Sequence, residues 1–144
     1  MKRSTRMEPV AEVAGHREQQ EAQRLGGCQR QLDEEENKLR QLIAYREEYA
    51  GRLNGQQGMD AVLLRDFRVF LERLNQAIDQ QRQRVEQARQ ACERQRLQWL
   101  ASRSRAQALD KVTARYRAQE RREEERAEQA ELDDRAQRGG SEEW

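Results

Sequence analysis

The feature that most constrains the fold is a series of mainly apolar residues, spaced alternately four and three positions apart, between residues 67 and 116. This heptad spacing keeps one narrow stripe of a long α-helix, here called its seam, facing a partner helix. The series consists of Phe67, Leu71, Leu74, Ile78, Gln81, Val85, Ala88, Cys92, Gln95, Trp99, Ser102, Ala106, Leu109, Thr113 and Tyr116. The pattern predicts a long helix that packs against another helix.

The composition favours long helices over a globular domain. Of the 144 residues, 38% are charged and 35% are hydrophobic, and the mean hydropathy is −1.30. This is too little apolar material for a globular interior, whereas Ala, Glu, Arg, Gln and Leu in heptad period are typical of long helices. We therefore expect one coiled-coil module over residues 1–144.

The sequence also bears on location. No apolar run reaches the roughly 18 residues that a transmembrane helix requires. The basic start at residues 1–6 leads into polar residues and lacks the apolar middle of a secretory signal. We therefore expect a soluble cytoplasmic protein with no membrane insertion.

The first helix is expected over about 8–53. Thr5 and Glu8 have the spacing of a capping box, and Pro9 is tolerated in a first turn because its missing N–H forms no bond there. Its seam consists of Leu25, Cys28, Leu32, Glu35, Leu39, Leu42, Arg46, Tyr49 and Leu53.

Glycines interrupt the first helical pattern. Gly26–Gly27 costs about 1 kcal/mol of helix propensity per residue. We therefore expect the upstream part, around Val10 and Val13, to bend or fray.

Residues 54–60, Asn-Gly-Gln-Gln-Gly-Met-Asp, are expected to form a bend. Either Gly55 or Gly58 suits the left-handed conformation that ends a helix, and Asp60 suits the start of the next one. The second helix is then expected over about 61–137, with a loose tail at 138–144 that begins before the Gly139–Gly140 pair.

Folding the chain at this bend aligns the two seams. The resulting layers are Tyr49 with Phe67, Leu42 with Leu74, Leu39 with Ile78, Leu32 with Val85 and Leu25 with Cys92. The expected hairpin core consists of Leu25, Leu32, Leu39, Leu42, Tyr49, Phe67, Leu71, Ile78 and Val85. The expected fold is all-α, a long antiparallel two-helix coiled-coil hairpin with unequal arms, although an arm-swapped dimer would use the same contacts.

The second arm is the longer one, so its C-terminal segment has no partner from its own chain. A polar helix of this kind is held only by propensity and side-chain pairs of about 0.2 to 0.5 kcal/mol each. We expect the overhang to fray until something binds it.

No catalytic constellation is evident, and we expect neither an enzyme nor a cofactor or metal site. His16 has no second imidazole or thiol nearby in the sequence, and the acidic runs 33–36 and 123–125 are typical of solvated helix faces. Cys28 and Cys92 lack metal-binding spacing. On the seams they would act as small apolar residues, without a redox role.

Charge is unevenly distributed although the net charge is only +1. Residues 80–119 carry ten basic and three acidic residues, whereas the segment after Gln119 is mainly acidic. This basic shaft could receive an acidic protein surface or be a solvated face, and the two readings are equally supported. Because Trp99 and Tyr116 lie on the seam and the net charge is small, we do not expect nucleic-acid binding.

Phe70 lies beside the seam rather than on it. With Leu63 and Ala77 it widens the apolar stripe near the bend. Phe70 either closes the end of the core or is an exposed anchor for a partner, and we favour the anchor.

Several stretches resemble the FliJ family of the bacterial flagellar type III export apparatus. They are Leu39–Tyr49 (LRQLIAYREEY), Leu53–Asn54 before the Gly-containing bend, Phe70–Arg82 (FLERLNQAIDQQR), Trp99, Arg103 to Arg105, and Ala108–Lys111. The similarity covers most of the chain. The two tyrosines, the bend and the Phe-Leu-Ala-Ile run occur in the same order.

The resemblance implies a stalk-like coiled coil at the cytoplasmic face of the inner membrane. Its partners would be the hexameric flagellar export ATPase, whose ring the paired N- and C-terminal arms enter, the export gate protein FlhA, and flagellar export chaperones. Gate contacts map to Phe70 and Leu74. Candidate ring contacts are Arg94, Arg96, Trp99, Arg103, Arg105, Lys111 and Tyr116.

Two alternatives remain open from the sequence. A stalk protein of a virulence type III secretion system would have the same hairpin but a different gate. A helical adaptor would instead bind nucleic acid or an anionic membrane through the basic shaft.

Overall fold

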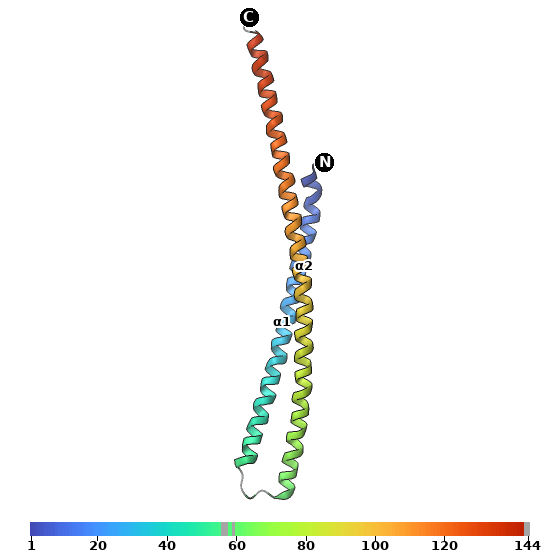
Figure 1. Cartoon of the computed structure of the whole chain (residues 1–144), viewed down its shortest axis with the longest axis vertical. Coiled ribbons are helices and arrows are strands. Elements are labelled where there is room, and N and C mark those ends of the chain that lie inside the picture. The colour runs from blue at the N-terminus through green and yellow to red at the C-terminus, as the bar shows by residue number, and fades with distance from the viewer. Residues whose placement is uncertain (56–57, 59, 143–144) are drawn as a thin grey trace. The chain divides into compact units, whose positions relative to one another are not determined.

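The computed structural model describes residues 1–55, 58 and 60–142. It contains two long helices, α1 (Arg3–Gly55) and α2 (Ala61–Glu142), of 53 and 82 residues. The helices pack against each other as an antiparallel hairpin with unequal arms (Figure 1). The expected all-α hairpin is confirmed.

The hairpin divides into two compact units. The first unit, here the bend unit, consists of residues 21–99, and the second, the terminal unit, consists of residues 1–20 and 100–144. Each unit contains a stretch of α1 and a stretch of α2, and each has its own buried stripe.

In the bend unit, the seam residues of both helices are buried or half-buried, and their neighbours on the outer faces are exposed. Ile78 is 1% exposed and has the largest fully buried side chain, and Val85 and Leu74 are also buried. The remaining expected core residues are half-buried, as befits a two-helix interface that has no third layer.

In the terminal unit, the seam of α1 continues to the start of the helix. Its positions are Ser4, Met7, Ala11, Ala14 and Glu18, all buried or half-buried, and they lie opposite a seam of α2 that includes Ala106, Leu109 and Thr113. These α1 residues are small, polar or flexible rather than branched apolar. The same 3-4 spacing therefore continues with little hydrophobic signal.

The start of α1 differs from the expectation. The helix begins at Arg3 rather than near Glu8, and the N–H of Arg6 bonds the carbonyl of Lys2 at 3.2 Å, so Thr5 is not a cap. Pro9 lies inside the helix. The upstream part of α1 is helical, and Val10 and Val13 are exposed because they lie off the seam.

The two glycines of the bend have different conformations. Gly58 has a positive φ of 83°, whereas Gly55 is the last residue of α1. The left-handed position is therefore Gly58. The carbonyl of Asp60 accepts the N–H of Leu64 at 2.9 Å, which places Asp60 at the start of α2. The other bend positions, 56, 57 and 59, lie outside the described residues.

α2 continues beyond its expected end near residue 137. Gly139 and Gly140 lie within the helix, which extends through Glu142. The expected loose tail at 138–144 is therefore wrong as far as residue 142, and the expectation for Trp144 falls outside the described residues.

Candidate partner-binding surfaces

Four aromatic side chains gather at the bend end of the bend unit. The ring of Tyr49 lies 5.7 Å from that of Phe67 and 4.9 Å from that of Phe70, measured between centroids. Tyr45 lies 4.7 Å from Tyr49 and meets Phe70 nearly edge-on at 6.2 Å. The expected layer of Tyr49 with Phe67 is confirmed, and the rings join α1 to α2 by contacts worth about 0.5 to 1.5 kcal/mol per pair.

Polar contacts hold the two tyrosines in place. The Tyr45 hydroxyl donates to the Tyr49 hydroxyl at 3.2 Å, and this bond is the main reason that the pKa of Tyr45 is raised. The guanidinium of Arg52 lies over the Tyr49 ring, 5.2 Å from its centroid. The cluster therefore presents hydroxyl and guanidinium groups beside apolar rings.

Phe70 and Leu74 differ sharply in exposure although they lie one helical turn apart. Phe70 is 38% exposed, whereas Leu74 is 8% exposed and belongs to the core. Exposed apolar side chains also lie nearer the start of α2, where Val62 and Leu63 precede Val69 and Phe70 by seven residues. We call this surface the bend patch, and it consists of Tyr45, Val62, Leu63, Val69 and Phe70.

Two layers of the bend unit, one buried and one half-buried, join a glutamine of α2 to a glutamate of α1. The amide of Gln81 donates to the backbone carbonyl of Glu35 at 3.0 Å and to its carboxylate at 2.5 Å. Gln95 bonds Glu21 in the same way, with 3.3 Å to the carbonyl. The bond from Gln81 is the main cause that lowers the pKa of Glu35. Sequence reasoning placed these residues on the seams but did not predict this paired bonding.

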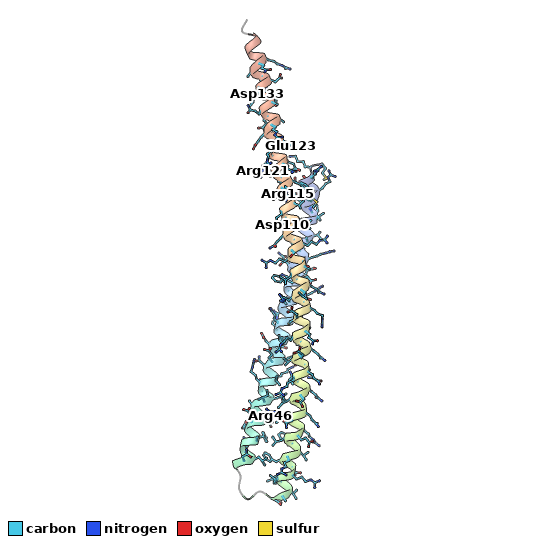
Figure 2. All side chains as sticks on the ribbon, viewed as in Figure 1. Arg46, Asp110, Arg115, Arg121, Glu123 and Asp133 are labelled. Atoms are coloured by element: carbon cyan, nitrogen blue, oxygen red, sulfur yellow. The ribbon has the colours of Figure 1, made fainter. Side chains whose placement is uncertain are left out.

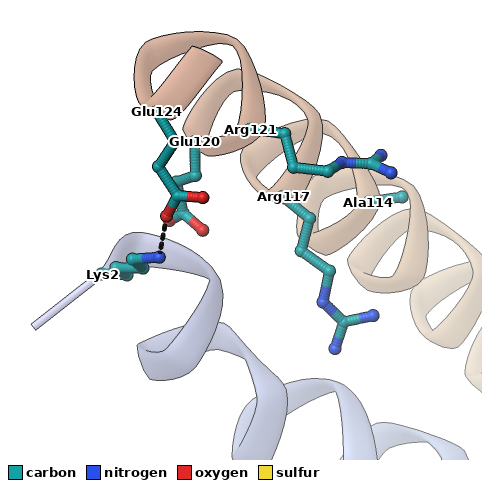
Figure 3. A pocket seen from close by; sticks show the side chains of 6 residues that line it. All are labelled: Lys2, Ala114, Arg117, Glu120, Arg121 and Glu124. Atoms are coloured by element: carbon teal, nitrogen blue, oxygen red, sulfur yellow. Dashed lines mark hydrogen bonds and ion pairs between the residues drawn. The ribbon is translucent and has the colours of Figure 1, made fainter. Parts of the chain in front are cut away.

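The N-terminus of α1 is held by acidic side chains of α2 within the terminal unit. Ser4 donates its backbone N–H at 3.1 Å and its hydroxyl at 2.5 Å to the carboxylate of Glu120. Lys2 forms an ion pair with Glu124 (Figure 3). Because Glu120 satisfies a free N–H of the first turn, it caps α1 from another helix, and the bonds from Ser4 lower its pKa.

Beyond Glu120, α2 is a single helix in the terminal unit. Every residue from 121 to 140 is exposed (Figure 2 labels Arg121, Glu123 and Asp133 on this segment). Pairs one turn apart support it, such as Arg135 with Glu131 at 2.9 Å and Gln129 with Asp133 at 3.2 Å. We call this segment, residues 121–140, the overhang.

The candidate ring contacts differ in exposure and in their partners. Trp99 and Tyr116 are half-buried on the seam, and Arg3 lies over the Tyr116 ring at 5.8 Å. Arg96 is ion-paired with Glu93 at 2.7 Å. The exposed cations among these candidates are Arg94, Arg96, Arg103, Arg105 and Lys111.

Comparison with known proteins decides the family. The sequence model of the flagellar FliJ protein matches residues 1–143. The chain belongs to the FliJ family. Neither a curated protein nor a solved structure matches the chain.

Membership of the FliJ family has direct consequences for the site. FliJ family proteins are non-catalytic components of the flagellar export apparatus, so surfaces for other proteins are the relevant features. In residues 1–55, 58 and 60–142, no group of three His, Cys, Asp or Glu side chains could hold a metal ion. No helix within the same residues has the length and apolarity to cross a membrane.

Proposed function

We propose that this FliJ family protein is the stalk of the flagellar export ATPase. In this role the terminal unit enters the hexameric ring and promotes hydrolysis, and the ATP chemistry belongs to the ring. The bend patch contacts the export gate protein FlhA. The match to the flagellar family favours this apparatus over a virulence secretion system.

The overhang is the single observation that carries the proposal. It is about 30 Å of helix, at 1.5 Å per residue, in which every residue is exposed and Glu124, near the start, pairs with Lys2. An isolated helix of this length is marginal in water, because one-turn ion pairs add only tenths of a kcal/mol. A central opening in a ring supplies the packing that such a helix lacks.

The charges of the overhang indicate what it meets. Residues 121–140 carry seven acidic and five basic side chains, and all of them are exposed. A mixed surface of this kind forms many weak contacts and no single deep anchor. It therefore suits a helix that inserts into the ring and activates it without locking the ring in one state.

The bend patch has the opposite character and suits a specific docking site. Phe70 is backed by Tyr45 and Tyr49, so little side-chain entropy is lost when a partner covers its exposed face. Aromatic anchors with this support are typical of binding hot spots. We assign Phe70 to contact with FlhA, whereas Leu74 acts by holding the helices together below it. Export chaperones are further proposed partners of the protein.

The first experiment measures ATP hydrolysis by the purified export ATPase against the concentration of this protein, at two salt concentrations. We expect a saturable rise in rate. A variant that ends after Glu120 keeps the contact between Ser4 and Glu120 but lacks the overhang, and we expect it to lose most of the stimulation.

A matched control replaces the exposed Gln83 of α2, outside the overhang and the bend patch, with Ala. It should stimulate like the unaltered protein. Stimulation that survives removal of the overhang would show that another part of the chain contacts the ring. A hydrolysis rate that does not rise at any ratio of the two proteins would contradict the stalk role.

A further inference from the structure

The start of α1 carries a second stripe of residues at heptad spacing. Its inner seam, from Ser4 to Glu18, packs against α2. A second series is offset from this seam and exposed throughout, with the same alternation of three- and four-residue steps, and consists of Arg3, Arg6, Val10, Val13 and Arg17. We call it the outer stripe. A helix with two such stripes suits a position between two helices, and within the terminal unit α2 covers only the inner seam.

The middle of the outer stripe borders an apolar groove of the terminal unit. Val10 is 43% exposed and Val13 is 56% exposed, although both side chains are apolar. The groove has a volume of about 310 Å³, which leaves room for side chains of another helix, and its lining consists of Pro9, Val10, Val13, Ala14, Arg17 and Arg105. Neither of these two arginines forms an ion pair with any residue that the structure describes. The groove therefore suits apolar side chains that are accompanied by carboxylates.

The overhang carries such a set of residues. The 3-4 seam of α2 continues past Tyr116 and Glu120, and its positions in the overhang are Glu123, Ala127, Ala130 and Asp134. All four are exposed, because α1 of the same chain begins at Arg3 and Ser4 already bonds Glu120. The continued seam thus presents two alanines between two carboxylates.

The outer stripe and the continued seam match residue for residue when the overhang runs parallel to α1. The matched pairs are Arg6 with Glu123, Val10 with Ala127, Val13 with Ala130 and Arg17 with Asp134. Both stripes take steps of four, three and four residues, so one register satisfies all four pairs. A shift of one heptad in either direction would instead set Val10 against Asp134 or Glu120.

Only a second copy of the chain can provide this parallel arrangement. The overhang runs antiparallel to its own α1 and extends beyond the start of that helix. If α2 of a second copy runs antiparallel to α2 of the first, each overhang runs parallel to α1 of the other copy. The lengths also agree, since the overhang and the α1 part of the terminal unit, residues 1–20, each have 20 residues, or about 30 Å of helix.

We propose that two copies of this chain form an antiparallel dimer in which the overhang of each copy binds the outer stripe of the other. One two-fold axis generates both contacts, so the assembly closes at two copies. The dimer covers Val10 and Val13 and gives each overhang a helix to pack against. An overhang that binds a second copy cannot enter a ring at the same time. The dimer is therefore a form of the free chain, and the inference does not depend on the stalk role.

Sedimentation equilibrium of the full chain, kept reduced and without other proteins, tests the dimer. We expect a mass that rises with concentration from 17.1 kDa toward twice this value. A variant that ends after Glu120 lacks the overhang and should stay monomeric. A full chain that remains monomeric at every concentration would contradict the proposal. So would a truncated chain that still dimerises, as an arm-swapped hairpin does.

Arg17→Asp and Asp134→Arg test the register of the contact. Each variant alone places like charges at both contacts of the symmetric dimer and should raise the dissociation constant about tenfold or more. An equimolar mixture of the two should dimerise like the unaltered chain, because the heterodimer has opposite charges at both contacts. A mixture that dimerises no better than either variant alone would overturn the proposal.

Ala130→Asp and Leu132→Asp are a matched pair within the overhang. Ala130→Asp sets a carboxylate against Val13 and should prevent dimerisation. Leu132 is more hydrophobic and 57% exposed but lies off the continued seam, so Leu132→Asp should leave the dimer intact. Circular dichroism checks that both variants keep their helix content. Equal effects of the two substitutions, or loss of the dimer in Leu132→Asp alone, would show that another face of the overhang makes the contact and would refute the proposed interface.

Discussion

The side-chain amide of Gln81 donates to two oxygens of Glu35, the backbone carbonyl at 3.0 Å and the carboxylate at 2.5 Å. One residue of α2 thereby forms hydrogen bonds to both the backbone and the side chain of one residue of α1. The same arrangement recurs 14 residues away on each helix, where Gln95 bonds Glu21. Apolar layers with similar side chains cannot distinguish one register from another, whereas these polar layers can.

Replacing Gln81 with Leu should change how stability depends on pH. The bond from Gln81 lowers the pKa of Glu35 in the folded protein from its ordinary value of 4.5. A lowered pKa stabilises the fold above the ordinary value, and this stabilisation is lost as pH falls through the folded value. Gln81→Leu should therefore raise the pKa of Glu35 and weaken the loss of stability below about pH 4.5.

NMR titration of the Glu35 carboxyl, together with urea denaturation at several pH values, measures this effect. Gln83→Leu changes an exposed residue of the same helix and is the control. An unchanged pKa of Glu35 in Gln81→Leu would show that the bond does not hold the carboxylate in solution.

Truncation of Ile78 should be the most damaging small substitution in the bend unit. Ile78 is 1% exposed, so Ile78→Ala leaves a cavity between the helices and should cost about 2 to 5 kcal/mol of unfolding free energy. Urea denaturation followed by circular dichroism measures the cost. Gln76→Ala, at an exposed position nearby, should change stability little, and an Ile78→Ala protein as stable as this control would contradict the packing of the two seams.

Substitutions of Phe70 and of Leu74 should have different effects on binding and on stability. Phe70→Ala should lose about 1 to 3 kcal/mol of stability, because its ring contacts with Tyr45 and Tyr49 disappear. It should abolish binding to purified cytoplasmic FlhA although the protein stays folded at the temperature of the measurement. Leu74→Ala should instead lose about 2 to 5 kcal/mol.

Calorimetric titration and thermal denaturation of the same samples distinguish the two roles. If Phe70→Ala binds FlhA normally, the bend patch is not the gate surface. If it melts like Leu74→Ala, Phe70 is a core residue.

Glycine substitutions should have opposite signs in α1 and in the bend. Gly26→Ala finds only the Arg30 side chain at ordinary contact distance and should stabilise the helix by about 0.5 to 1 kcal/mol. Gly58→Ala forces a side chain into a backbone with φ of 83° and should destabilise the hairpin by about 1 to 2 kcal/mol. Thermal denaturation measures both, and Gly55→Ala is the control for the bend. Stabilisation by Gly58→Ala would show that the bend is not held in this conformation.

The heptad spacing predicted the architecture well because it depends on residue positions rather than on residue chemistry. Every position of the seam from Phe67 to Tyr116 is buried or half-buried, including polar members such as Gln81 and Thr113. The start of α1 was harder to predict. Its seam there consists of Ser4, Met7 and Ala11, which give little hydrophobic signal. The more hydrophobic Val10 and Val13 lie on an exposed face.

The site residues were predictable in part. Phe70 was recognised as an edge residue because it lies one step off the seam, and its partial exposure agrees with an anchor. The capping of α1 by Glu120 was not predicted, because Ser4 and Glu120 are 116 positions apart and no local signature links them.

The two glutamate–glutamine layers also have a mechanical consequence. Sliding α1 by one heptad would place the Glu35 carboxylate opposite Leu74 or Ala88, neither of which has a side-chain donor, and would place Glu21 opposite Ala88 or Ser102. Small slips are no better, because they turn the seam residues away from each other. A pull along one helix of the bend unit therefore reaches the other helix as displacement and is not lost in sliding between them.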